Sequence, residues 1–171
     1  MYSKFQSLLK IRGVKTTLEL CLILLAFVLL KSWMQRSMIE GRPPNIQGQL
    51  LNGQHINMQS LQGKPVLLHF WASWCGICKL EQDSIEAISK DHAVISIAMK
   101  SGHVDEVRQY MNAHHLSFPV INDPDGEIAN RFGVRAVPAT FILNPTGEIS
   151  FKETGYTTGW GLRIRLWLAA D

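Results

Sequence analysis

Eleven consecutive apolar residues, 20–30, divide this chain into two parts that must fold in different surroundings. Together with its flanks the segment is long enough to cross a bilayer, because about 20 helical residues span the hydrocarbon core. Glu19 and Lys31, near its ends, can extend their charged groups toward the headgroups. We therefore predict a transmembrane anchor over residues 16–34, preceded by a cytoplasmic N-terminus over residues 1–15.

The basic residues around this segment predict its orientation. Four precede it and three follow it: Lys4, Lys10, Arg12 and Lys15, then Lys31, Arg36 and Arg42. The positive-inside rule then leaves the N-terminus in the cytoplasm and the rest of the chain outside. Two alternatives stay open. A short apolar centre is also typical of a cleaved signal peptide, although no small-x-small cleavage site follows it, and a buried core helix is the third possibility.

Charge and prolines mark where the second part begins. Residues 1–42 hold seven Lys or Arg against two acids, and residues 43–171 hold ten against twelve, so +5 and −2 add to the net charge of +3. The basic character belongs to the N-terminal part, and the rest lacks the basic surface of a nucleic-acid-binding domain. Pro43-Pro44 closes a predicted linker over residues 35–44. We expect one domain over residues 45–171.

The pattern of apolar residues predicts alternating strands and helices in this domain. The run 66–71 is apolar at nearly every position, as in a strand buried on both faces. Asn52-Gly53 predicts a hairpin turn within 49–58. Further strands are expected at 93–98, 118–121, 140–143 and 149–152, and helices at 75–90, 103–114, 125–132 and 159–170. This order predicts an α/β fold, a mixed sheet with helices on both faces.

Cys75 and Cys78 directly follow the buried strand and open the next predicted helix. At positions i and i+3 of a helix, two sulfur atoms are close enough to form a disulfide. Free N–H groups at a helix start favour a thiolate, so we expect the pKa of Cys75 below the usual value of about 8.5. Cys75 is the predicted nucleophile, and Cys78 the residue that resolves the mixed disulfide.

Other roles for this pair are weighed against redox exchange. A structural disulfide closing four residues would remove little loop entropy. A closed zinc site needs two further ligands, and the remaining cysteine, Cys21, lies in the predicted anchor. Copper binding or delivery, with an imidazole joining the thiolates, stays open as the alternative function; the candidate histidines are His103, His114 and His115. We predict no metal site, and no cofactor besides the redox-active disulfide.

Two segments carry a family resemblance. Phe70 to Lys79, FWASWCGICK, and Gly133 to Phe141, GVRAVPATF, resemble the signature segments of the thioredoxin superfamily, in the same order. Within it, residues 43–171 resemble the membrane-anchored TlpA/ResA/CcmG-like thiol-disulfide oxidoreductases. The Trp-Cys-Gly-Ile-Cys form is most similar to that of suppressor-of-copper-sensitivity proteins. The resemblance implies a thioredoxin-like sheet with helices on both faces.

The resemblance also implies which residues hold a substrate. Val137-Pro138 matches the cis-proline element, which faces the cysteines and offers backbone groups to an extended peptide. The alternative is an ordinary trans proline at the start of a strand. Trp74, Gly76 and Ile77 complete the implied substrate-binding residues.

One position departs from the thioredoxin pattern. Thioredoxin carries a buried Asp on the strand before the active site, and this chain has His69 there. Glu81 matches the active-site Glu of ResA-like proteins and shares a helix face with Cys78, which makes it the candidate catalytic acid and base. Its alternative role is to stabilise the start of the helix. His69 is either a satisfied interior residue or a second proton carrier.

Partners and location follow from the same resemblance. The anchored branch works in the periplasm from the bacterial inner membrane and mostly reduces disulfides. Implied partners are a DsbD-like membrane electron donor and, as substrates, oxidised exported proteins or apocytochrome c. We therefore expect a monomeric, single-pass reductant that binds no nucleic acid, with copper tolerance arising through repair of oxidised cysteines. The opposite direction, disulfide insertion, stays open because the Gly-Ile dipeptide does not fix the potential.

Overall fold

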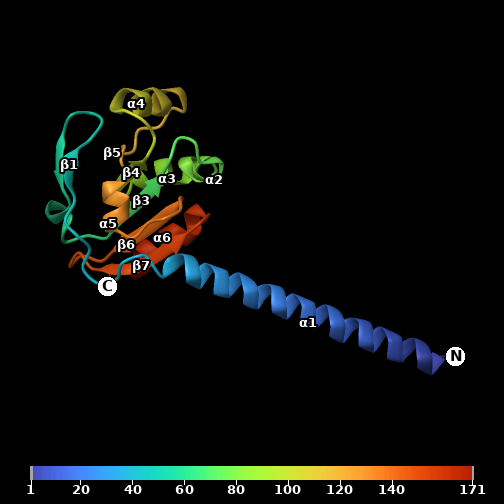
Figure 1. Cartoon of the computed structure of the whole chain (residues 1–171). Helices are drawn as coiled ribbons and strands as arrows, with labels where there is room; N and C mark the ends of the chain where they lie inside the picture. The colour runs from blue at the N-terminus through green and yellow to red at the C-terminus, as the bar shows by residue number, and fades with distance from the viewer. Residues whose placement is uncertain (1, 171) are drawn as a thin grey trace. The chain divides into compact units, whose positions relative to one another are not determined.

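The computed structural model of this chain describes residues 2–170, with side chains from residue 15 onward. They form two compact units, one ending at Arg36 and the other beginning at Ser37. The first is a single helix, α1 (Tyr2–Gln35), drawn in blue in Figure 1. The side chains of the predicted cytoplasmic segment, residues 1–15, lie almost wholly outside the described part, so its location stays a prediction.

Helix α1 carries the predicted anchor. Its segment Lys15–Gln35 is 21 residues long, contains an 18-residue window with a mean hydropathy of 1.9, and is long and apolar enough to cross a membrane. No residue of its 18-residue apolar window is buried, whereas a core helix would be mostly buried. The helix is consistent with a single-pass membrane anchor, as predicted for residues 16–34.

The second unit is built on a five-stranded mixed sheet. Its strands lie in the order β5-β4-β3-β6-β7, with β4 parallel to both β3 and β5, and β6 antiparallel to both β3 and β7. Every residue of the central strand is buried, as its apolar run predicts. The strands are β3 (Val66–Trp71), β4 (Ala93–Met99), β5 (Val120–Asp123), β6 (Ala139–Leu143) and β7 (Ile149–Thr154).

Helices cover both faces of this sheet, as expected. Leu67 and Trp71 of β3 pack on one side with α3 (Gln82–Ser89), α4 (Val104–Ala113) and α6 (Gly159–Leu168). Val66, Leu68 and Phe70 pack on the other with α5 (Glu127–Arg131), the 3-10 helix η1 (Met58–Leu61) and the predicted hairpin, which pairs β1 (Gln47–Gln49) with β2 (His55–Asn57). This alternation follows from the period of two in a strand.

The helix predicted over residues 75–90 is broken in two. The first piece, α2 (Gly76–Lys79), is a single turn, and α3 begins only at Gln82. Between them the N–H groups of Leu80 and Glu81 donate to carbonyls three residues back, at 3.1 and 3.0 Å. Leu80 is 69% exposed and Glu81 is 1% exposed. The break therefore turns the acid inward and the apolar residue outward, a reversal that apolar spacing could not reveal.

The domain also begins earlier than predicted. The Ser37 hydroxyl donates to the Gly133 carbonyl at 2.8 Å, and the Ile39 N–H donates to the Phe132 carbonyl at 3.2 Å. From Ser37 onward, the segment predicted as a linker over residues 35–44 is thus hydrogen-bonded to the domain. The two prolines indicated a non-helical connector, but they carry no sign that it packs on the domain.

Candidate active site

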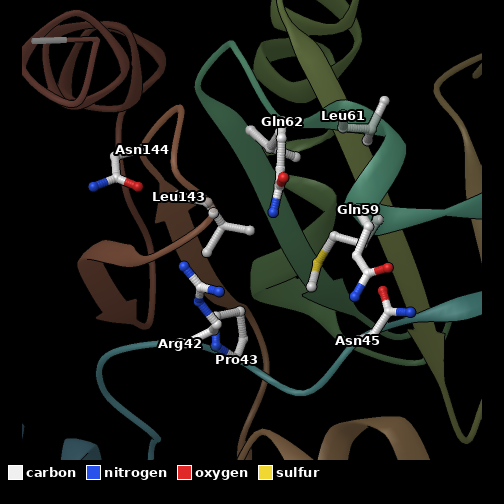
Figure 2. Close-up of a pocket in the computed structure, with 11 residues that line it drawn as sticks. Arg42, Pro43, Asn45, Gln59, Leu61, Gln62, Leu143 and Asn144 are labelled. Atoms are coloured by element: carbon white, nitrogen blue, oxygen red, sulfur yellow. The ribbon is translucent and has the colours of Figure 1, made fainter.

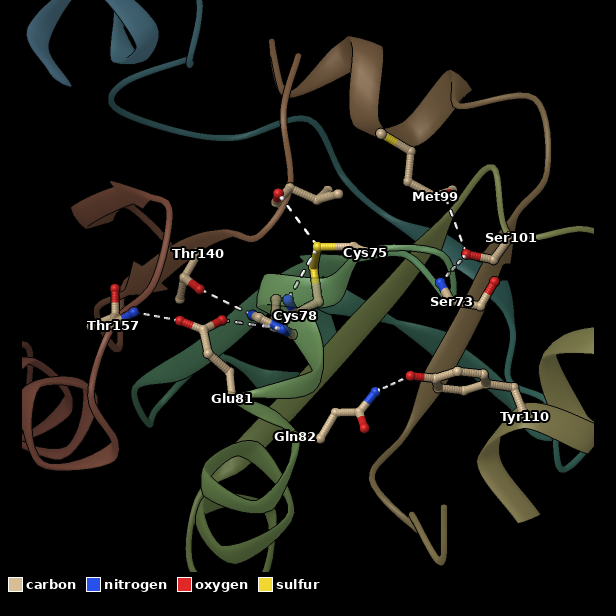
Figure 3. The surroundings of a disulfide bond; sticks show 12 residues. Ser73, Cys75, Cys78, Glu81, Gln82, Met99, Ser101, Tyr110, Thr140 and Thr157 are labelled. Atoms are coloured by element: carbon tan, nitrogen blue, oxygen red, sulfur yellow. Dashed lines mark hydrogen bonds and ion pairs between the residues drawn. A yellow bond between two sulfur atoms is a disulfide. The ribbon is translucent and has the colours of Figure 1, made fainter. Parts of the chain in front are cut away.

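Cys75 and Cys78 form a disulfide just beyond the end of β3 (Figure 3). Their Cα atoms are 5.3 Å apart. Cys75 is the residue that caps α2, with extended backbone angles (φ −84°, ψ 106°), and its Sγ accepts the Cys78 N–H at 3.1 Å. Cys75 thus lies immediately before the first residue of α2, at the start of the helix. A hydrogen bond from a backbone N–H to this sulfur favours a thiolate on Cys75 once the disulfide is reduced.

The two sulfur-bearing residues differ in access. Cys75 is 6% exposed, whereas Cys78 is fully buried. A protein partner can therefore meet Cys75 but not Cys78. The order of nucleophile and resolving residue stays a prediction, in which the more accessible Cys75 attacks first.

The Val137-Pro138 element faces the disulfide. Its peptide bond is cis, and the Val137 carbonyl oxygen lies 3.6 Å from Cys75 Sγ. Both residues precede β6, the antiparallel neighbour of β3. The sheet thus brings together two segments that are about 60 residues apart in the chain.

Apolar side chains near the disulfide are exposed. Trp74 is 62% exposed, with its indole N–H donating to the Lys100 carbonyl at 2.8 Å, and Ile77 is 52% exposed. A Cβ built on Gly76 would meet nothing within 4 Å, so the backbone between the cysteines is open. Of the predicted substrate-binding residues, Val137 is half-buried and Pro138 is buried, whereas Trp74, Gly76 and Ile77 are thus accessible. Leu80 joins them through the helix break, without a signal in the sequence.

Glu81 lies in the interior behind Cys78. Its N–H donates to the Cys78 carbonyl at 3.0 Å, and its Oε1 accepts the N–H of Thr157 (Figure 3). Its other oxygen, Oε2, is buried without a hydrogen-bond partner among the described residues. Burial raises the pKa of Glu81 to about 7, against the opposing effect of the Thr157 hydrogen bond. The carboxyl group can therefore gain and lose a proton near neutral pH.

His69, on β3, is the neighbour of this carboxyl group. Its Nε2 lies 3.9 Å from Glu81 Oε2, and its Nδ1 lies 3.1 Å from Thr140 Oγ1. Burial lowers the pKa of His69 to about 4, so the imidazole is neutral at neutral pH. Sequence reasoning missed Thr140 and Thr157. Thr140 lies opposite His69 in the register of β3 and β6, and no local pattern reveals a register.

The histidines considered for copper do not join the cysteines. His114 Nδ1 lies 2.9 Å from the Tyr110 carbonyl oxygen, and its ring stacks on Tyr110. His103 caps the start of α4. In the part of the chain with described side chains, no group of three His, Cys, Asp or Glu is placed to hold a metal ion.

A pocket of about 110 Å³ lies at the opposite end of the sheet (Figure 2). Its lining includes Arg42 and Pro43 from the segment before β1, Gln59 and Gln62 near η1, and Asn144 after β6. The lining also includes Val66, the first residue of β3, whereas the disulfide lies just beyond Trp71, the last residue of that strand. The pocket is therefore separate from the redox centre.

Similarity to known proteins agrees with this geometry. The AhpC/TSA family model matches residues 39–152. A thioredoxin-like protein of Haemophilus influenzae is 33% identical over 158 residues, covering 91% of this chain and 94% of the relative. The thiol:disulfide interchange protein DsbE of Xylella fastidiosa is 32% identical over 160 residues, covering 89% and 81%.

Solved structures show the same fold. A secreted Mycobacterium tuberculosis disulfide oxidoreductase, described as homologous to Escherichia coli DsbE, superposes with a TM-score of 0.63 at 27% identity. The match covers 72% of this chain and 95% of that structure. The thioredoxin-like fold is thereby confirmed, while the similarity to suppressor-of-copper-sensitivity proteins stays a prediction. With its dithiol at Cys75 and Cys78, the chain belongs to the AhpC/TSA family and is a thiol-disulfide oxidoreductase of the DsbE type.

Proposed function

We propose that this protein reduces disulfides of exported proteins from the outer side of the bacterial inner membrane, to which α1 anchors it. The observation that carries the proposal is the unequal placement of the two cysteines. Cys75 meets the surface beside Val137, and Cys78 is buried one turn before Glu81, whose pKa burial raises to about 7. A nucleophile, a resolving thiol and a proton acceptor are thus present in the order that substrate reduction needs.

The reaction follows from these positions. The Cys75 thiolate attacks a substrate disulfide, a mixed disulfide forms, and the released substrate thiolate takes a proton from water. Glu81 in its carboxylate form accepts the proton of the Cys78 thiol. The Cys78 thiolate then attacks Cys75 Sγ, which closes the Cys75–Cys78 disulfide and releases the second substrate thiolate. Two electrons pass from the dithiol to the substrate, and a DsbD-like membrane protein returns them.

Location is supported by the chain and its relatives. Basic residues are more numerous before the apolar part of α1 than after it, which favours a cytoplasmic N-terminus and an external domain. A similar solved oxidoreductase is described as secreted. In an oxidising compartment, the dithiol stays reduced only if a membrane carrier supplies electrons.

Electron flow is tested by two measurements on the full-length protein. We expect Cys75 and Cys78 to be free thiols when cells are acid-quenched and alkylated, and to become oxidised when the membrane electron donor is deleted. We also expect a reducing potential, close to that of thioredoxin at about −270 mV. A strongly oxidising couple that is disulfide-bonded in growing cells would show that the protein inserts disulfides instead.

A further inference from the structure

Three polar side chains form a row inside the apolar interior, each on a different element. Thr140 lies on β6, His69 on β3 and Glu81 at the break between α2 and α3; they are 4%, 2% and 1% exposed. Thr140 Oγ1 lies 3.1 Å from His69 Nδ1, and His69 Nε2 lies 3.9 Å from Glu81 Oε2. The row starts next to the Val137-Pro138 element and ends one turn after Cys78.

The end of the row is incomplete. Buried polar atoms in proteins nearly always have a hydrogen-bond partner, and leaving one without a partner costs about 1–3 kcal/mol. Glu81 Oε2 is buried without such a partner among the described residues, and His69 Nε2 is the ring nitrogen that faces it. A movement of about 1 Å would bring the two atoms to hydrogen-bonding distance.

We propose that His69 is a positioning residue for Glu81, and that with Thr140 it keeps the Glu81 carboxyl group hydrogen-bonded both with and without its proton. This inference rests on the proposed function, in which Glu81 takes the proton of Cys78.

The chemistry of the three groups allows both states. When Glu81 is ionised, Nε2–H of the imidazole donates a hydrogen bond to Oε2, and Nδ1 accepts a hydrogen bond from the Thr140 hydroxyl. When Glu81 holds the proton taken from Cys78, its O–H donates to Nε2, and Nδ1–H donates to Thr140 Oγ1. Glu81 alone gains or loses a proton. The imidazole is neutral in both states, with its N–H on Nε2 when Glu81 is ionised and on Nδ1 when Glu81 is protonated, and the Thr140 hydroxyl is the donor in the first state and the acceptor in the second.

The two states are not stabilised equally. A hydrogen bond to a carboxylate is roughly twice as strong as one between neutral groups, so His69 favours the ionised form of Glu81 more than an apolar side chain would. It thereby opposes the effect of burial. The titratable group next to Glu81 in the oxidised protein is His69 from β3, because Cys78 of α2 is held in the disulfide; β6 brings the uncharged Thr140, and the loop before α6 brings the Thr157 backbone. The charged groups of β7 and α6 include Glu153 and Arg165, which pair with each other: Arg165 Nη2 lies 2.8 Å from Glu153 Oε1.

The test reads the protonation of Glu81 directly. The full-length oxidised protein, labelled with carboxyl-13C glutamate in nanodiscs, is titrated by NMR, with Glu81→Gln identifying the signal. We expect a midpoint near 7 in the wild type. His69→Leu should raise it by about one pH unit or more, because the donor to the carboxylate is lost. His69→Gln, whose amide supplies a donor and an acceptor, should restore a midpoint near that of the wild type.

Thr140→Val keeps the test decisive if His69→Leu does not fold. It removes the group that holds Nδ1, and we expect a smaller rise of the Glu81 midpoint. An unchanged midpoint in every folded variant would overturn the positioning role. The proposed function is measured separately, by reduction of insulin disulfides with the wild type. If insulin is not reduced although the midpoint shifts, the proposed function fails and the role of His69 in setting the Glu81 protonation stands.

Discussion

Cys75 Sγ lies 3.6 Å from the carbonyl oxygen of Val137, so the more exposed sulfur of the disulfide meets the segment that precedes β6. Cys78 Sγ lies on the inner side, where burial is complete. A substrate backbone that docks along Val137 would bring its own sulfur to Cys75. In the proposed mechanism, Cys75 therefore forms the mixed disulfide on its outer side, and Cys78 resolves it from the inner side.

Substitution of each cysteine should separate these steps. Cys75→Ala should abolish insulin reduction, because the buried Cys78 thiol does not reach a protein disulfide. Cys78→Ala should leave the first attack intact and accumulate mixed disulfides, visible as bands on non-reducing gels that disappear with reductant. If Cys78→Ala accumulates no such species while Cys75→Ala does, the order of nucleophile and resolving residue is reversed.

The exposed side chain of Ile77 should contribute to substrate affinity. Ile77→Ser removes an apolar group next to Cys75, and we expect KM for a disulfide-bonded peptide to rise about fivefold, from roughly 1 kcal/mol of lost burial. The value of kcat should be nearly unchanged, since no reacting atom moves.

The matched control is Ile164→Ser on α6. Ile164 is 55% exposed and Ile77 is 52% exposed, so both substitutions remove similar apolar surface. The control should leave KM as in the wild type. An equal rise of KM in both variants would mean that the substrate-binding surface is not confined to the residues around the disulfide.

The buried carboxyl group should make stability depend on pH. Burial raises the pKa of Glu81 from 4.5 to about 7, so the folded protein binds a proton in this range that the unfolded chain does not. Stability from this group is thus fully present below about pH 4.5 and is lost as the pH rises to about 7. Between these values, Glu81→Gln should gain roughly 2–3 kcal/mol relative to the wild type.

Urea unfolding of the protein in detergent at pH 5 and pH 8 measures this difference. Glu148→Gln, on the exposed turn between β6 and β7, controls for the loss of an acid and should follow the wild type. His69 has the opposite sign: its pKa is lowered to about 4, so its contribution to stability is lost as the pH falls from 6.5 to that value. A constant difference between Glu81→Gln and the wild type would mean that Glu81 does not titrate in this range.

Gly133 lies against the segment that begins at Ser37, and we expect that segment to leave no room for a side chain at this position. Its φ is +67°, and a Cβ there would lie 1.7 Å from the Ser37 carbonyl oxygen. Gly133→Ala should therefore lower the free energy of unfolding by roughly 3 kcal/mol, from backbone strain and displacement of the segment. Urea denaturation measures the loss.

Gly155→Ala separates the two causes. Gly155 has a φ of +84°, but a Cβ there would meet nothing within 4 Å, so only strain of about 1 kcal/mol is expected. An equal loss in the free energy of unfolding for both variants would show that displacing the segment at Ser37 does not destabilise the domain.

The sheet and the dithiol could be predicted from the sequence because each has a local cause. The apolar run at Val66–Trp71 indicates a central strand, and two cysteines three residues apart at the start of the next helix favour a redox pair over a structural disulfide or a zinc site. The break at Leu80 and Glu81 has no such cause. It leaves Glu81 Oε2 facing His69 Nε2 at 3.9 Å, and His69 lies 12 residues earlier in the chain.

Long-range contacts also explain the other differences. Thr140 meets His69 through the pairing of β3 with β6, and Ser37 meets Gly133 across 96 residues. Neither contact leaves a periodic or compositional trace. Charge and prolines therefore predict a linker over residues 35–44, and only the hydrogen bond from Ser37 to Gly133 shows that Ser37 belongs to the domain.

The complete burial of Cys78 gives the domain a chemical signature that can be counted from outside. We expect the native reduced domain to offer a bulky maleimide one reactive sulfur, that of Cys75, and the oxidised domain to offer none. Cys21 in α1, outside the domain, is a further free cysteine. Denaturation before labelling would reveal the second sulfur. The number of maleimide groups attached before and after denaturation thus reports the redox state of the protein in intact membranes.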